Sequence, residues 1–182
     1  MPIELETLVQ QLPGIGKARS VRLEKLGIVR AADLLYWFPR DYEDRRQSWS
    51  IAEAPVGEKQ CVVAMVAELP RTTWVRKGMD FTRLRAVDDT GSLVITFFHQ
   101  SYVRSALEVG ERYVFYGIVE GTLWRKTMTN PVFEREGAGR FTGCIMPIYP
   151  LTEGISQQLL SGSVRRVLPD CLEQLTDDLP ET

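Results

Sequence analysis

Apolar and polar residues alternate with a period of two along most of the stretch 59–134, which is the pattern of half-buried β-strands. In one such strand Leu93, Ile95 and Phe97 form an entirely apolar row. Because successive side chains of a strand point to opposite faces, this row is predicted to face a core. Phe98 ends the other, mixed row. We expect it to be more exposed than Phe97, either as a packing residue at the rim or as part of a working surface.

Five strands are predicted, and the turns between them are marked by Gly and Asp, as in the sequence DDTG at 88–91. A stretch with helical spacing, 100–109, separates the third strand from the fourth. This order is that of the OB-fold, so we predict a mainly β chain built on a five-stranded Greek-key OB-fold barrel. The predicted strands cover residues 60–69, 80–89, 91–98, 111–121 and 126–134.

The two ends of the chain favour helices. Apolar residues recur at helical spacing over 3–12, 17–26 and 30–38, and the second of these helices has Ala18, Val21 and Leu26 on one stripe. Gly27 suits the left-handed residue that closes a helix, and Pro39 stops the third one. Residues 40–50 are polar and are predicted to be a linker, whereas the C-terminal stretch is predicted to be a helix with Thr152 as a possible cap. The predicted organisation is a helical segment 1–46, the barrel 47–150 and a C-terminal helix 151–182.

Composition indicates the class of protein to which the chain belongs. With 44% hydrophobic and 25% charged residues, the 182-residue chain has ordinary globular composition. No apolar run reaches the ~20 residues of a membrane span, and the acidic N-terminus lacks a signal peptide, so a cytoplasmic protein without membrane partners is expected. Three widely spaced cysteines are predicted to be reduced thiols, not a disulfide framework or a zinc site.

Catalytic motifs are missing from the sequence. The segment LPGIGKA resembles a phosphate loop, but the position five residues before Gly16 is Gln11, and Ala18 stands where a magnesium-binding hydroxyl is needed. The same segment fits a helix-hairpin-helix pattern, in which the amides of Gly14 and Gly16 and the charges of Lys17 and Arg19 are candidates for holding a DNA phosphate. The alternative is a hairpin that only packs on the barrel. No metal site is predicted for the single histidine.

The charge distribution supports a nucleic-acid interface in the middle of the chain. The net charge is −2 overall, but residues 71–126 carry nine Lys and Arg against six Asp and Glu. In OB-folds the connections flanking the groove hold single strands with basic and aromatic side chains. Ordinary packing of tryptophans over the barrel mouth is the alternative. The candidate DNA-binding residues are Arg71, Trp74, Arg76, Lys77, Arg83, Arg85, Arg104, Trp124, Arg125 and Lys126.

Four stretches taken together resemble the N-terminal part of the RecG family of ATP-dependent branched-DNA helicases. They are LPGIGKA with LEKLGI, DLLYWFPRDYEDR, DDTGSLVITFFHQSY and PIYPLTEGISQQLL. The resemblance implies that the β region is the wedge domain, which parts strands at a fork or four-way junction. It also implies that Phe98 and Tyr102 are an aromatic pair that stacks on terminal base pairs. His99 stands where Asn is more usual in that family.

The resemblance carries further expectations. The chain shows no Walker A or DExH motif, so it is expected not to be an enzyme by itself and to hold no cofactor, with ATP and magnesium implied only for absent motor domains. A monomeric, bacterial, cytoplasmic protein that binds branched DNA is expected, in the service of fork reversal, recombination and repair.

Two alternatives stay open at the level of sequence. The barrel groove is a candidate dock for a Pro-rich peptide such as the linker of single-strand-binding protein, clasped by Trp74, Trp124 and Tyr116. A purely structural role, with little DNA affinity of its own, is the other.

Overall fold

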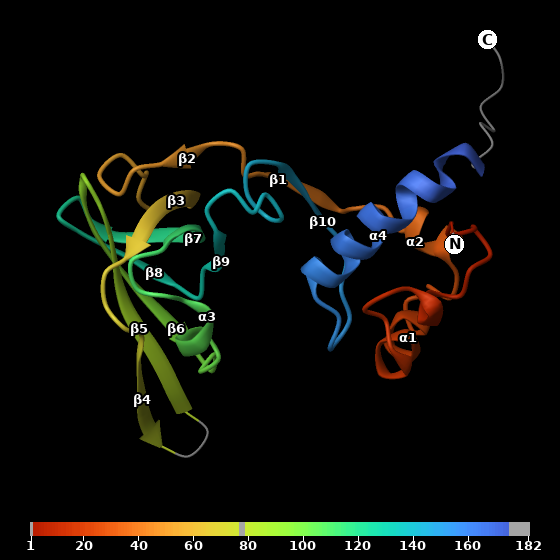
Figure 1. The fold of residues 1–182 in the computed structure, drawn as a ribbon, viewed down its shortest axis with the longest axis horizontal. Helices are drawn as coiled ribbons and strands as arrows, with labels where there is room; N and C mark the ends of the chain where they lie inside the picture. The colour runs from red at the N-terminus through yellow and green to blue at the C-terminus, as the bar shows by residue number, and fades with distance from the viewer. Residues whose placement is uncertain (1, 77–78, 175–182) are drawn as a thin grey trace, which may run out of the picture. The chain divides into compact units, whose positions relative to one another are not determined.

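The structure is a computed structural model that describes residues 2–76 and 79–174 (Figure 1). The chain divides into two compact units: one combines Met1–Glu43 with Met146–Thr182, and the other is Asp44–Ile145. The N-terminal and C-terminal segments of the chain therefore belong to one unit. Near the boundary, strands β1 (Asp41–Asp44) and β10 (Ile145–Ile148) pair into a two-stranded sheet.

The second unit is a closed five-stranded barrel. Its strands are β3 (Lys59–Val66), β5 (Met79–Asp88), β6 (Gly91–Phe98), β7 (Arg112–Thr122) and β8 (Arg125–Thr129). They are hydrogen-bonded in the order β3-β5-β6-β8-β7, and β7 pairs with β3 to close the ring. The β6–β8 pair is parallel, and the one-turn helix α3 (Val103–Ala106) lies between β6 and β7. The chain is thus mainly β, and the predicted OB-fold barrel is confirmed.

Four strands outside the ring correct the sequence prediction. Residues 71–76, expected to be a connection, form β4 and pair with β5 in a hairpin (Figure 1). The predicted fifth strand is interrupted after β8 and resumes as β9 (Val132–Arg135), because Asn130 is left-handed (φ 48°) and Pro131 has no amide hydrogen to donate. The polar linker contains β1 and also β2 (Ser48–Trp49), which pairs in parallel with β3.

The barrel core follows the predicted alternation. Leu93, Ile95 and Phe97 are completely buried, whereas 43% of Phe98 is exposed, as expected. The turn after β5 also behaves as predicted. The carboxylate of Asp88 accepts hydrogen bonds from the amides of Thr90 and Gly91 and from the Thr90 hydroxyl.

The first unit is helical. It contains α1 (Lys17–Glu24), α2 (Ala31–Leu35), α4 (Gln157–Cys171) and the 3₁₀ turns η1 (Val9–Gln11) and η2 (Leu172–Gln174). The helix predicted over 3–12 is only η1, because this segment pairs with residues 29–32 instead: Ala32 N donates to Leu5 O and Ala31 N to Thr7 O.

Two local predictions for this unit are also wrong. Of the predicted stripe, Ala18 and Val21 are exposed and only Leu26 is partly buried, whereas the adjacent Leu23 is completely buried. Helix α4 is capped by Ser156, whose hydroxyl accepts from Leu159 N, and not by Thr152. Gly27 has the expected left-handed conformation.

Two further expectations concern the state of the cysteines and the absence of a membrane span. Cys61, Cys144 and Cys171 are free thiols, and burial raises the pKa of Cys61 to about 11. None of the described helices is both long and apolar enough to cross a membrane.

Candidate nucleic-acid interface

One continuous face of the barrel unit carries four of the predicted arginines. Side chains on the outer face of β4, β5, β6 and β8 line two adjoining depressions of about 400 and 290 Å³, which share Arg83 and Val94. We call this surface the basic face. Its members are Arg71, Thr73, Phe81, Arg83, Arg85, Val94, Thr96, Phe98, Arg125, Thr127 and Thr129. The strand alternation that buries Leu84 and Ile95 turns these residues outward.

The arginines of the basic face differ in their surroundings. Arg71 lies directly opposite Arg83 in the β4–β5 register, and no described carboxylate forms an ion pair with either. The Arg83 guanidinium lies 5.7 Å from the centroid of the Phe81 ring, within reach of a cation–π interaction. Like charges opposite one another destabilise a sheet, and an anion between them relieves the repulsion. This arrangement suits a phosphate.

Arg85 is already neutralised. Its Nε lies 2.8 Å from Oε1 of Glu68, which is held near β5 because the neighbouring Ala67 N donates to Arg85 O. Both side chains are about half exposed, so the pair is a weak surface ion pair that a phosphate can compete with.

Two more predicted cations are available to solvent. Arg104, on α3, lines a third depression along β4 together with Arg71 and Glu68. Arg125 begins β8 at the far end of the basic face. Among the residues that the structure describes, neither has a carboxylate partner.

The predicted aromatic pair lies at the end of β6. Phe98 is the last residue of the strand, and Tyr102 comes immediately before α3 with 60% of its surface exposed. The Phe98 ring lies against Phe81, with centroids 6.2 Å apart. Both aromatics of the pair thus have free surface for stacking, whereas Phe97 has none.

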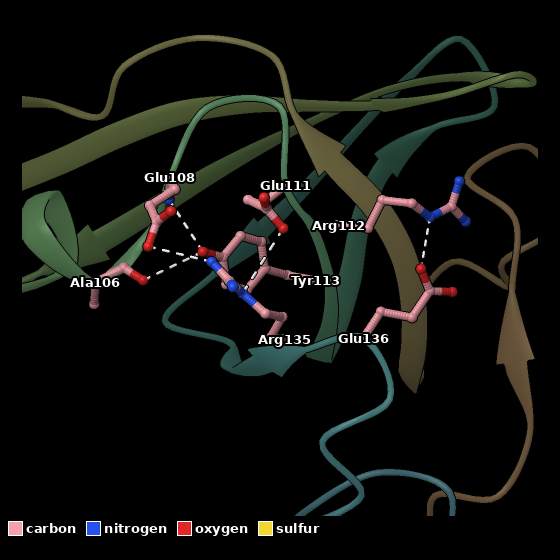
Figure 2. A network of polar contacts seen from close by, with 7 residues as sticks. All are labelled: Ala106, Glu108, Glu111, Arg112, Tyr113, Arg135 and Glu136. Atoms are coloured by element: carbon pink, nitrogen blue, oxygen red, sulfur yellow. Dashed lines mark hydrogen bonds and ion pairs between the residues drawn. The ribbon is translucent and has the colours of Figure 1, made fainter.

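A hydrogen-bond network holds the elements that follow Tyr102 (Figure 2). The Tyr113 hydroxyl accepts from Glu108 N and donates to Ala106 O at the end of α3. Arg135 of β9 pairs with Glu108 and Glu111, as Figure 2 shows. These contacts tie α3 and the following turn to β7 and β9.

Lys126 was predicted to contact DNA, and this prediction is wrong. Its side chain is buried, and its ammonium donates to the carbonyls of Ala52 and Ala54, both at 2.7 Å. Burial lowers its pKa, and the charge of Asp88 opposes that shift. In the β8 alternation Lys126 belongs to the row of buried Met128, a signal already present in the sequence. Lys126 is therefore a structural residue of the barrel and not a surface cation.

The three aromatic residues predicted to clasp a Pro-rich peptide differ in position and exposure. Trp74, 70% exposed, pairs with Asp80 and so lies on the hairpin face opposite to that of Arg71. Trp124 is 94% exposed at the β7–β8 turn, beside exposed Leu123. Tyr116, expected to be exposed, is buried beneath the Arg45 guanidinium, 3.9 Å from its ring centroid.

Two predicted residues lie outside what can be placed. Lys77 is not among the described residues, and for Arg76 only the backbone, in β4, is described.

The hairpin before α1 has the geometry of a backbone turn with exposed glycines. Gly14 is left-handed (φ 85°) and Gly16 caps α1, but the Arg19 guanidinium donates to Gly14 O at 2.6 Å and is engaged in holding the turn. Lys17 is exposed at the start of the helix. In the described part of the chain, no group of three metal-ligating side chains occurs.

Sequence reasoning missed Asn130 and Gln100. Asn130 lies between β8 and β9, and its side chain meets the end of β6, 32 residues earlier in the chain. The only sequence signal was the NP dipeptide, which indicates a turn but gives no partner.

Comparison with known proteins gives one consistent answer. Residues 9–171 match the family described as RecG wedge domain. The ATP-dependent DNA helicase RecG of Thermotoga maritima is 31% identical over 98% of this chain, and that of Escherichia coli K12 is 27% identical over 95%. A solved structure of RecG bound to a three-way DNA junction superimposes with a TM-score of 0.83 at 29% identity, covering 100% of this chain. The chain spans about a quarter of the length of these relatives (23%, 27% and 25%).

Proposed function

This chain belongs to the RecG wedge-domain family, and from that premise we propose that its barrel unit binds branched DNA, at replication forks and four-way junctions. The observation that carries the proposal is the exposed pair Phe98 and Tyr102 at the edge of the basic face. A branch point exposes the flat ends of its duplex arms, and these can stack on aromatic rings. Continuous duplex offers no such end in its middle.

The basic face supplies the second part of the proposed interaction. Arg71, Arg83 and Arg125 are exposed and lie along outward-facing strand positions. Contacts of this kind hold phosphates without reading base sequence, so recognition is by the shape of the junction.

Strand separation is proposed for a longer protein only. The relatives are named ATP-dependent DNA helicases, and this chain covers about a quarter of their length. In such a protein the wedge stacks on the base pairs at the branch while a motor, using ATP and magnesium, pulls duplex past it. This activity would serve fork reversal, recombination and repair.

The test is a titration of the 182-residue chain with a fork and with a linear duplex of equal length, in both of which hairpin loops close the free duplex ends. We expect the wild type to prefer the fork, and Phe98→Ala and Tyr102→Ala to lose about fivefold or more in fork affinity, since a stacked base contributes ~1–3 kcal/mol. Phe38→Ala, which removes an exposed aromatic of the other unit, is the matched control. Equal fork affinity of all four proteins would refute the proposal.

A second candidate function rests on the apolar turn of β7–β8. Trp124 and Leu123 are the most exposed large apolar side chains described, and phosphate binding gives Leu123 no role. A Pro-rich peptide, such as the linker of single-strand-binding protein, is the proposed ligand. Salt-insensitive peptide binding that is lost in Trp124→Ala supports this function, and its absence at high peptide concentration excludes it.

A further inference from the structure

Phe98 ends β6 at a place where its neighbouring strand has already stopped. β8 ends at Thr129, which is paired with Thr96, and the chain then turns at left-handed Asn130. Asn130 N still donates to Thr96 O at 2.8 Å, which fixes Asn130 at the end of the β6–β8 pair. In a longer β8 strand a backbone carbonyl would accept the hydrogen bond from Phe98 N. Here the side-chain oxygen Oδ1 of Asn130 accepts it instead, at 2.7 Å.

The same amide oxygen is linked to the second aromatic. Gln100 Nε2 donates to Asn130 Oδ1 at 3.4 Å, and Gln100 Oε1 accepts from the Tyr102 hydroxyl at 3.1 Å. Phe98 and Tyr102 are therefore connected by three successive hydrogen bonds through two amide side chains. Left-handed His99 (φ 55°) turns the chain between Phe98 and Gln100.

Such a link has no evident purpose in the barrel core. Phe98 and Tyr102 are exposed and Gln100 is partly buried. The fully buried residues beside them, Phe97 and Val103, contribute no atom to the three hydrogen bonds. Its effect is on the rings: the end of a strand frays and an exposed tyrosine rotates freely unless both are held. Stacking on two rings requires that their spacing is set before DNA arrives, because ordering them on binding costs affinity.

We propose that Asn130 and Gln100 are positioning residues that hold Phe98 and Tyr102 at a fixed spacing for stacking at the branch point. This inference rests on the proposed function, and assigns the Tyr102 hydroxyl a role that its ring alone does not have.

The sharpest test is Tyr102→Phe, which keeps the ring and removes only the hydroxyl. We expect fork affinity to fall about two- to fivefold, as for the loss of one hydrogen bond, with binding to linear duplex unchanged. Gln100→Ala should behave similarly. Tyr42→Phe, at an exposed tyrosine of the other unit, is the control and should bind like the wild type.

Asn130 can be tested without disturbing its backbone. Asn130→Gly keeps the left-handed conformation and loses the amide, whereas Asn130→Asp keeps the acceptor for Phe98 N. We expect Gly to weaken fork binding about two- to tenfold and Asp to restore most of it at a salt concentration that screens the added charge. Melting temperature is measured for each variant, and a positioning role predicts that it changes little.

A spectroscopic readout separates positioning from general weakening. With 2-aminopurine in the terminal base pair at the branch, stacking on a ring quenches its fluorescence. At saturating protein we expect less quenching with Tyr102→Phe and Asn130→Gly than with the wild type. If these two variants match the wild type in fork affinity and quenching while Phe98→Ala and Tyr102→Ala lose fork binding, the positioning inference is wrong and the proposed function stands. If the wild type itself shows no fork preference, the proposed function fails first.

Discussion

At the scale of single residues, His99 has a backbone conformation that few side chains favour. His99 is left-handed, a conformation that costs most L-residues energy and that Asn, Asp and Gly adopt more readily. We therefore expect the backbone conformation, more than the 3.9 Å approach of the His99 ring nitrogen to Asp80, to govern which residue is most stable at this position.

His99→Asn and His99→Gly are therefore expected to raise the free energy of unfolding, by about 0.5–1 kcal/mol. Urea denaturation measures the change, and His99→Ala, which cannot relieve the strain, is the control. A loss of stability in both Asn and Gly variants would mean that the contact with Asp80 outweighs the backbone.

Lys126 and Arg125 are adjacent cations in opposite surroundings, since Lys126 is buried and Arg125 is exposed. Lys126→Met leaves the carbonyls of Ala52 and Ala54 without their donor, so we expect it to lose about 1–3 kcal/mol of stability without a change in fork affinity. Arg125→Gln should keep stability and weaken fork binding, with a shallower dependence on salt. Urea denaturation and fork titration at two salt concentrations check both. Weaker fork binding by folded Lys126→Met would contradict its structural role.

At the scale of elements, the β4–β5 hairpin determines which arginines are available. Pairing of β4 with β5 sets Arg71 against Arg83 and leaves Glu68, in the preceding connection, beside Arg85. Arg85 was predicted to bind DNA on equal terms with the others. In the structure it has an acidic partner, and its contribution depends on whether that partner is displaced.

We expect Glu68→Gln to tighten fork binding about two- to fivefold, because it releases Arg85 for a phosphate at the cost of a weak ion pair. The log–log salt slope should steepen by ~0.7–0.9, the value for one added phosphate contact.

The matched comparison is Arg85→Gln in the two backgrounds. It should weaken binding little in the wild type and markedly in Glu68→Gln. If Arg85→Gln alone is as damaging as Arg83→Gln, Glu68 does not restrain Arg85.

At the scale of the whole molecule, each unit has its own hydrophobic core. The barrel core is drawn from residues between Ile51 and Met128, with Phe133 packed on it, and the core of the helical unit from residues 9–34 and 149–171. Distant ends of the chain therefore complete one unit, and the barrel is a continuous segment.

A fragment comprising residues 44–145 is accordingly expected to fold alone and to retain fork preference over linear duplex. Circular dichroism, cooperative thermal unfolding and fork titration check this, with Phe98→Ala in the fragment as control. A folded fragment without fork preference would show that the helical unit contributes to binding.

Acid should destabilise the barrel unit through two carboxylates. Burial of Glu134 raises its pKa, but the hydrogen bonds that its carboxylate accepts outweigh burial and hold the pKa below 4.5. These bonds come from the Thr142 hydroxyl and from the amides of residues 140–142. The pKa of Asp88 is likewise held below 3.8, by hydrogen bonds from Thr90, Gly91 and Ile51. A carboxyl whose pKa is lower in the folded state contributes stability above its unfolded pKa and loses it as pH falls through the folded value.

The melting temperature should therefore fall as pH drops below about 4.5. Glu134→Gln should be less stable than the wild type at pH 7, and this difference should shrink at pH 3. A difference that is independent of pH would mean that the charge of Glu134 is unimportant.

The sequence by itself determined the barrel, its core row and the exposed position of Phe98, because period-two alternation and turn residues are local properties of the chain. The same alternation places Lys126 in the buried row, although its charge favours a position at the surface. Only the tertiary structure showed that residues 71–76 form a strand, that Glu68 pairs with Arg85, and that Asn130 reaches Phe98. Those contacts depend on register and on the meeting of segments far apart in the chain, which no local pattern specifies.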